Sequence, residues 1–534
     1  MIKQLSAKID GREMEDNLEI IDAILEERGI EDLDEFLYPN PDDILPLEDL
    51  KHIDEAAQAI LDSVCMGETF LVYYDTDVDG CTSGSIATRY LQHLGADVYT
   101  YINEGKKHGI DEFNTDLLDD IDIVWIVDSI QTNIDPYKKM LDKNVKIIIT
   151  DHHLVSEELQ EKMEELGIIL VSSAVEYDNP DLSGSATTWK LCQYIDFLNL
   201  DDFSDNLIDL AATGLISDMC SMMSPENRAI CDKAFKNLKN PGIKKINGGY
   251  AFVARNISFG IAPKINAANR VNENNLAMQV FLTDDEDEIS QIIKGLNQCK
   301  ERQNKIVDEI MPDLIQQGNK QIGSKCKFFF IPSEMDAQIS GLLGNKLLEI
   351  YSTPLLVIGQ YGDEYSGSAR AVGVKSFKKY FEDVDIGWSG GHPNAFGCGI
   401  PIDRFEEFQQ KILESLSEVE FVSETVADIQ MLPEQVTDVF IKNLNSINRI
   451  SGADFEPISV MIETDNYDVK NMSGGKHLKI VDNDTGMIFV KWNYNGSWDF
   501  SGTFRAIGTL EKAHYGRTDY RQLTVQDFDV YTTK

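Results

Sequence analysis

Residues 69–95 read TFLVYYDTDVDGCTSGSIATRYLQHLG, a pattern that predicts a strand followed by a helix. Its first six residues are apolar, aromatic or β-branched, which is typical of a short buried strand, and the segment from residue 83 onward has helical spacing. The acidic residues between them are Asp75, Asp77 and Asp79. These three carboxylates are therefore expected at the carboxyl end of a strand, where open α/β sheets bind their ligands.

Taken alone, the DxDxDG pattern fits a solvated acidic turn as well as a cation site, because neighbouring anions repel each other unless water or cations surround them. The ends of later segments favour the cation site. IDIVWIVDS brings Asp128 to a strand end, VKIIITDHH brings Asp151, His152 and His153, and LAATGLISDM ends near Asp218. Because parallel strand ends meet at one edge of a sheet, we expect these side chains to converge.

The predicted ligands are carboxylates with one or two imidazoles, a set that suits two divalent cations, Mn²⁺ or Mg²⁺, better than zinc held by thiolates. Two such cations can activate water and hold a phosphoryl group during in-line attack. The eight cysteines are scattered without a CxxC pair, which favours a reducing compartment and argues against structural zinc. The sequence therefore predicts a two-cation phosphoryl-transfer site.

The order of patterns predicts several domains. Strand-like and helical segments alternate from about residue 68 to residue 225, which is typical of a doubly wound parallel α/β sheet. A long polar helical stretch, read as one helix or a helical hairpin, precedes a second α/β unit with the Gly-rich GGHPNAFGCGIP at 390–401. Short strands separated by Gly, Asn and Asp in the last hundred residues predict a small antiparallel barrel, and the acidic start is expected to be mostly helical.

The charge of the chain limits its partners. The formal net charge of -43 predicts repulsion from nucleic acid and from anionic membranes, except where a local surface differs. Residues 1–55 carry 18 acidic against 5 basic residues, whereas residues 451–534 carry 12 against 9. There is no run of about 20 apolar residues and no signal-peptide pattern at the start, so we expect a cytoplasmic protein without membrane contact.

The ordered motifs resemble the DHH phosphoesterase superfamily and, within it, the RecJ family of single-strand-specific 5′ exonucleases. DxDxDG, the VDS aspartate, DHH and the later aspartate match the superfamily, and GGHPNAFG resembles its associated second domain. LSGSATTWKL, FGIAPKINAANRV and GSARAVG are similar to RecJ segments, although the family usually has glycine at the position of Asn269. The domain boundaries we expect are an acidic segment 1–55, a DHH catalytic domain 56–265, a helical bridge 266–322, a DHH-associated domain 323–430, and an oligonucleotide-binding (OB)-like nucleic-acid-binding domain 431–534.

The resemblance also implies roles for individual residues. The metal ligands would be Asp75, Asp77, Asp79, Asp128, His152 and Asp218. Asp128 would bridge the two cations, and Asp75 would either bind a cation itself or contact a residue that does. Asp151 would orient His152, and His153 would face the scissile phosphate. The residues expected to bind the substrate are Arg270, Ser368, Arg370, His392 and Trp492, the first three at the 5′ phosphate and Trp492 by stacking on a base.

The resemblance implies a metal-dependent exonuclease that degrades single-stranded DNA from the 5′ end to mononucleotides in recombination, repair or replication. A single-strand-binding protein or a helicase would be its protein partners. Two alternatives remain open from the sequence. One is a phosphodiesterase for short oligonucleotides or cyclic dinucleotides, which the net acidity favours. The other is an inactive scaffold in a replication assembly, which the complete set of acidic and imidazole side chains disfavours.

Overall fold

The computed structural model describes residues 2–104, 109–111, 113–332, 337–494, 499–515 and 518–531. The chain divides into two compact units. The site unit comprises residues 34–303 and 449–456. The terminal unit comprises residues 1–33, 304–448 and 457–534, and therefore holds both ends of the chain.

The site unit is built around five parallel strands in the order β3-β2-β4-β5-β6. Their bounds are β2 (Thr69–Tyr74), β3 (Asp97–Ile102), β4 (Ile123–Val127), β5 (Lys146–Asp151) and β6 (Ile169–Ser172). The chain order reverses between β2 and β4, so this is the switch point at which such sheets open a crevice. The prediction of a doubly wound parallel sheet is confirmed, and the acids after β2 and β4 flank that crevice.

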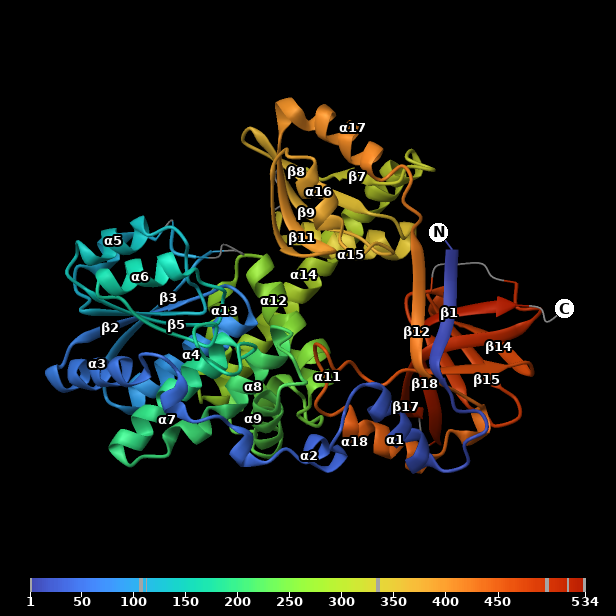
Figure 1. Ribbon diagram of the computed structural model, residues 1–534, viewed down its shortest axis with the longest axis horizontal. Coiled ribbons are helices and arrows are strands. Elements are labelled where there is room, and N and C mark those ends of the chain that lie inside the picture. The colour runs from blue at the N-terminus through green and yellow to red at the C-terminus, as the bar shows by residue number, and fades with distance from the viewer. Residues whose placement is uncertain are drawn as a thin grey trace. The chain divides into compact units, whose positions relative to one another are not determined.

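Helices cover both faces of this sheet (Figure 1). They include α3 (Ile53–Met66), α4 (Val78–His93), α5 (Asp135–Leu141), α6 (Glu157–Glu165) and α7 (Gly184–Asn199). Helix α8 (Ile208–Ser217) packs on α4 and α7, and α9 (Pro225–Lys236) packs on α8. Tyr73, Ile126 and Ile149 face α5 and α6 in one buried apolar cluster. On the other face Trp125 donates its indole N–H to Thr150, whose hydroxyl lies 2.7 Å from that of Thr188 on α7.

After α12 (Ala262–Arg270) and α13 (Asn274–Leu282), the predicted polar stretch forms one helix, α14 (Glu286–Asn319), rather than a hairpin. Pro312 lies inside α14. None of the helices in the described residues combines the length and the apolar character that a membrane span needs.

The terminal unit contains a five-stranded sheet in the order β10-β11-β9-β8-β7. Its strands are β7 (Lys327–Phe330), β8 (Leu355–Tyr361), β9 (Glu364–Arg370), β10 (Trp388–His392) and β11 (Ala395–Pro401). Helices α15 (Ser340–Tyr351), α16 (Phe377–Asp383) and α17 (Phe405–Ser415) pack with it around two apolar cores. The predicted second α/β unit is therefore present.

The remaining strands form an eight-stranded sheet in the order β1-β12-β13-β17-β18-β16-β15-β14. Their bounds are β1 (Ile2–Asp10), β12 (Val422–Met431), β13 (Val460–Thr464), β14 (Tyr467–Met472), β15 (His477–Asp482), β16 (Ile488–Lys491), β17 (Thr503–Tyr515) and β18 (Thr518–Tyr531). The C-terminal β region is confirmed, but the sheet is mixed, since β12 pairs in parallel with β1 and with β13. The acidic start is thus not wholly helical: β1 precedes α1 (Asn17–Glu27) and completes a sheet whose other strands lie beyond residue 420.

Candidate metal centre

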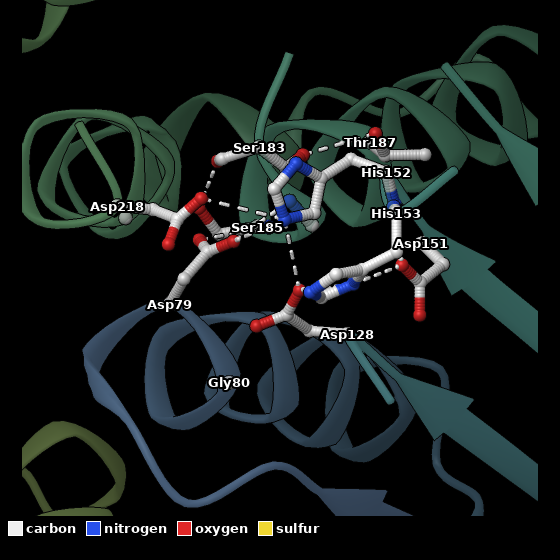
Figure 2. Close-up of polar contacts among 12 residues, drawn as sticks. Asp79, Gly80, Asp128, Asp151, His152, His153, Ser183, Ser185, Thr187 and Asp218 are labelled. Atoms are coloured by element: carbon white, nitrogen blue, oxygen red, sulfur yellow. Dashed lines mark hydrogen bonds and ion pairs between the residues drawn. The ribbon is translucent and has the colours of Figure 1, made fainter. Parts of the chain in front are cut away.

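Three separate segments of the site unit, after β2, after β4 and after α8, bring acidic side chains to the crevice, and Figure 2 labels Asp79, Asp128 and Asp218 from them. Asp75 follows β2 directly, and Asp77 caps α4 by accepting the N–H of Gly80 at 2.9 Å. Asp128 follows β4 in the left-handed region, with φ of 55°, and Asp218 caps the carboxyl end of α8. The sequence places these residues as much as 143 positions apart, and the parallel topology gathers them at one edge.

The imidazole of His152 lies among three carboxylates, as Figure 2 shows. Its Nε2 is 3.3 Å from Oδ1 of Asp128, 3.4 Å from Oδ2 of Asp218 and 3.9 Å from Oδ2 of Asp79. Asp75, Asp77 and Asp128 form a second group, whose ligand atoms lie within 4.8 Å of one another. All six residues that the sequence proposed as ligands are thus brought together, and their binding of cations stays a prediction.

The amino end of α7 and two glycines hold this cluster in place. Both oxygens of Asp79 accept backbone N–H groups at the start of α7, from Gly184 at 2.7 Å and from Ser185 at 3.1 Å. A Cβ on Gly184 would lie 2.6 Å from Oδ1 of Asp128, and a Cβ on Gly214 would overlap Oδ1 of Asp79. Gly184 and Ser185 lie in the motif LSGSATTWKL, and Gly214 lies in LAATGLISDM. The sequence pattern alone predicted no role for any of the three.

Asp151 contacts a different histidine ring from the expected one. Its Oδ1 accepts the backbone N–H of His152 and of His153 at 2.6 and 2.8 Å, and lies 2.7 Å from Nδ1 of the His153 ring. The expectation that Asp151 orients the ring of His152 is therefore wrong in this structure. The reason is that the His153 ring folds back over the strand end, whereas Nε2 of His152 faces the carboxylates of the crevice.

The pair of Asp151 and His153 is a preformed ion pair. The hydrogen bond that the His153 ring donates to Asp151, together with the charge of that carboxylate, raises the pKa of His153 to about 9. Burial raises the pKa of Asp151, but the hydrogen bond and charge of His153 outweigh it and lower the pKa to about 2. His153 is therefore a cation near neutral pH, and because its side chain is 56% exposed it can meet a substrate.

The electrostatics of the cluster fit a cation site. Burial, with the charges of Asp79, Asp77 and Asp151, raises the pKa of Asp128 well above its usual range, and burial also raises that of Asp79. Oδ1 of Asp128 is buried and accepts no hydrogen bond from the described residues. Ionised carboxylates at this density need a compensating positive charge. Carboxylates with one imidazole are donors for hard or borderline divalent ions, so the residues present fit a Mn²⁺ or Mg²⁺ pair.

This electrostatic arrangement predicts how the metal-free protein depends on pH. Burial, and then the charges of Asp79 and Asp77, raise the pKa of Asp218 from 3.8 to about 8. Between these two pH values the folded protein binds more protons than the unfolded chain, so its free energy of unfolding falls as pH rises through that window. Mn²⁺ must displace those protons, so its affinity should rise with pH, by about tenfold per pH unit for each proton released.

Calorimetric titration of Mn²⁺ in two buffers with different ionisation enthalpies measures both the affinity and the protons released. Urea unfolding of the metal-free protein at the same pH values gives the stability. An Mn²⁺ affinity that stays constant between about pH 6 and about pH 8 would contradict the raised carboxylate pKa values.

One further residue of the site unit was expected to bind the substrate. Arg270 ends α12, and its Nη1 lies 3.4 Å from Oε1 of Gln303. Its neighbour Asn269 is buried and donates its side-chain N–H to the carbonyl of Thr76 at 2.7 Å. The asparagine that departs from the family pattern thus ties the end of α12 to the loop between Asp75 and Asp77.

The other expected substrate residues lie in the terminal unit. Ser368 and Arg370 are on β9, and the Ser368 hydroxyl lies 2.8 Å from that of Ser340. Arg370 donates to Oδ1 of Asn345 at 2.8 Å and to the carbonyl of Ala369 at 2.7 Å. No carboxylate in the described part of the chain pairs with it. Burial lowers the pKa of Arg370.

His392 is exposed at the end of β10, an edge strand of its sheet. Trp492 follows β16 and is 45% exposed, with its ring edge-on to His477 at 4.9 Å. Tyr494, two residues later, is buried, while Trp498 lies outside the described residues. Of these two aromatic side chains, Trp492 is exposed enough to stack on a base, whereas Tyr494 belongs to the core.

Comparison with known proteins finds two family-model matches along the chain. Residues 69–215 match the model of the "DHH family, N-terminal domain", and residues 323–418 match the "DHHA1 domain". YorK of Bacillus subtilis strain 168, an SPbeta prophage-derived protein provisionally named a single-strand DNA-specific exonuclease, is 29% identical over 422 residues, covering 72% of each chain. The single-stranded-DNA-specific exonuclease RecJ of the same organism is 24% identical over 86% of this chain and 61% of its own length.

Among solved structures, RecJ from Thermus thermophilus in complex with Mn²⁺ has a TM-score of 0.80 at 20% identity, over 99% of this chain and 80% of that chain. This likeness shows a shared fold, because the identity is too low to carry more. The chain therefore contains a segment that matches the DHH family, followed by a segment that matches the DHHA1 domain, and it resembles RecJ in sequence and in fold.

Proposed function

We propose that the protein is a metal-dependent exonuclease that hydrolyses single-stranded DNA from the 5′ end. The observation that carries the proposal is the cluster around His152, where Asp79, Asp128 and Asp218 surround one imidazole nitrogen. The relatives named single-strand DNA-specific exonucleases support the substrate, and the RecJ resemblance supports the polarity. Action in recombination, repair or replication, and a single-strand-binding protein or helicase as a partner, belong to the same proposal.

The residues divide the work of phosphodiester hydrolysis. Asp75, Asp77, Asp79, Asp128, His152 and Asp218 would hold two divalent cations. When bound, such a pair lowers the pKa of water and offsets the negative charge of the phosphodiester. His153, protonated through its contact with Asp151, would donate to a non-bridging phosphate oxygen where charge develops.

Other residues would fix the position of the strand. Arg270 and Arg370 carry planar guanidinium groups that match a terminal phosphate, with Ser368 as a further donor. His392 would approach the substrate from the DHH-associated domain. The proposed division is the DHH catalytic domain 56–265, the helical bridge 266–322, the DHH-associated domain 323–430 and the OB-like domain 431–534, with the acidic segment 1–55 before them. Exposed Trp492 beside Lys491 supports base stacking in the last of these.

The test is digestion of a single-stranded 50-mer labelled at one end, beside a dinucleotide and a cyclic dinucleotide, by metal-free protein with and without Mn²⁺. We expect no cleavage without the metal and stepwise release of mononucleotides from the 5′ end with it. Faster cleavage of the dinucleotides would replace the proposal with a small-substrate phosphodiesterase. Absence of cleavage of every substrate by a folded, Mn²⁺-loaded protein would favour the scaffold alternative.

Arg370 provides a separate prediction about end recognition. Its half-buried guanidinium has no carboxylate counter-ion among the described residues, which leaves its charge available to a phosphate. Charge-assisted hydrogen bonds contribute about 1.5–3 kcal/mol each, so Arg370→Ala should lower kcat/KM on 5′-phosphorylated strands by about 10–100-fold. On 5′-hydroxyl strands the loss should be much smaller, and Mn²⁺ affinity should not change.

Arg404→Ala is the matched control, because Arg404 is an exposed arginine of the same unit that already pairs with Glu407 at 3.2 Å. It should cleave both substrates at the wild-type rate. An equal loss on both substrates in Arg370→Ala would remove Arg370 from the phosphate site. Internal cleavage of circular single strands by the wild type would contradict end recognition as a whole.

A further inference from the structure

A cysteine lies within the cluster and belongs to none of the six predicted ligands. Cys220 comes two residues after Asp218, and its side chain is 7% exposed. The backbone N–H of Cys220 donates to the carbonyl of Leu215 at 3.1 Å. Met219, which lies between Asp218 and Cys220, has a left-handed backbone conformation with φ of 59°. The tight turn after α8 brings both side chains to the crevice: the sulfur of Cys220, a carboxylate oxygen of Asp218 and a ring nitrogen of His152 all lie within 4.8 Å of one another.

The second donor group of the crevice has a different composition. Asp75, Asp77 and Asp128 offer only carboxylate oxygens, which hard cations such as Mg²⁺ and Mn²⁺ prefer. His152, Asp218 and Cys220 offer nitrogen, oxygen and sulfur, a set that suits borderline and soft ions. The crevice therefore contains two donor groups of unequal softness.

An independent observation marks the space between these groups as a cation position. Oδ1 of Asp128 is buried, with 2% of the side chain exposed, and accepts no hydrogen bond from any described residue. It lies within ion-pair distance of two imidazole nitrogens, Nε2 of His152 at 3.3 Å and Nδ1 of His153 at 3.8 Å, but neither contact has hydrogen-bond geometry. A buried carboxylate oxygen in this state calls for a positive charge.

We propose that Cys220 is a metal ligand in the His152–Asp218 group, so that this position binds Co²⁺, Zn²⁺ or Cd²⁺ more tightly than the all-oxygen position does. As the sulfur–metal bond forms, the thiol proton leaves to solvent, because the cation stabilises the thiolate. The inference rests on the proposed function for the location of the cation pair, and it makes no use of the hydrolytic reaction.

The test is absorption spectroscopy of the metal-free full chain titrated with Co²⁺ and, separately, with Cd²⁺. A thiolate ligand gives a sulfur-to-metal charge-transfer band in the ultraviolet, which oxygen and nitrogen ligands do not give. We expect the band in the wild type and its loss in Cys220→Ser and Cys220→Ala. The matched controls are Cys231→Ser, which alters another buried cysteine of the site unit, and Cys81→Ser, which alters the cysteine on α4 beside the acidic loop.

Both control variants should keep the band. In Cys220→Ala the affinity for Cd²⁺ should fall at least about tenfold while that for Mn²⁺ changes less than about threefold, since the lost ligand is the soft one. A wild type without the band, or a band that persists in a folded Cys220→Ser protein, would overturn the proposal. DNA is absent from these titrations, so a protein that shows the band but cleaves no DNA would refute the proposed function and leave the ligand assignment standing.

Discussion

Replacing Asp128 with asparagine should lower the rate of Mn²⁺-dependent cleavage by more than about 100-fold, since even residues that only orient a metal ligand contribute about 10–100-fold. Asp128 is the residue common to both sides of the crevice: it lies in the group of Asp75 and Asp77 and faces Nε2 of His152. Asparagine keeps its shape but loses the charge that would be shared between two cations. Steady-state cleavage of a labelled single strand measures the loss.

The same substitution should leave the metal-free protein at least as stable as the wild type. Burial and the neighbouring carboxylates raise the pKa of Asp128, so its ionised form opposes folding as pH rises, and the neutral amide removes that effect. Asp122→Asn is the matched control, because Asp122 precedes the same strand at its opposite end and is exposed. Near-wild-type turnover by Asp128→Asn would refute the assignment of this residue as the shared ligand.

Gly214→Ala should lower Mn²⁺ affinity and cleavage together by about 10–100-fold, because it displaces a ligand without removing one. A methyl group at this position in α8 would overlap Oδ1 of Asp79 and the hydroxyl of Ser185, so the Asp79 carboxylate would have to leave its place at the start of α7. Calorimetric titration of Mn²⁺ measures the affinity.

Stability should respond much less than metal binding in this variant. Overpacking costs about 1–3 kcal/mol, and alanine in place of glycine inside a helix returns about 1 kcal/mol. Gly260→Ala is the control, since a Cβ there would meet open space, and it should bind Mn²⁺ like the wild type. Wild-type Mn²⁺ affinity in Gly214→Ala would show that the exact position of Asp79 does not matter.

The strand ends of the site could be predicted because local pattern and topology agree there. The apolar runs before Asp75 and Asp128 form buried strands, and parallel pairing brings their ends together whatever the intervening loops do. The pattern is weaker in β3, an edge strand in which exposed residues such as Asp97 and Tyr99 interrupt the apolar run. β1 lies in the start that was expected to be mostly helical, and it was missed because its pairing partner is more than 400 residues away.

Contacts that depend on the exact backbone position or on the side-chain rotamer could not be predicted from the sequence. Nothing in TDHH indicates which ring folds back onto Asp151, since both histidines are within reach, and the structure selects His153. The need for glycine at 184 and 214 also depends on how closely α7 and α8 approach the carboxylates, which is a matter of helix packing. Cys220 follows LAATGLISDM directly, but the sequence does not show that the turn after α8 brings its sulfur to the crevice.

The long-range pairing of β1 with β12 affects the order in which a growing chain can fold. Residues 2–10 are synthesised long before their partner strand, which begins at Val422, so β1 stays unpaired until that strand emerges. The sheet of the site unit, from β2 to β6, is complete by residue 172, but the N–H of Met222 bonds the carbonyl of Ala453, which emerges much later. Contacts between residues so far apart in the sequence slow folding, and the strand edges that wait for them stay open to other chains. A chaperone that holds the first ten residues during translation would therefore raise the yield of folded protein more than one that acts after release.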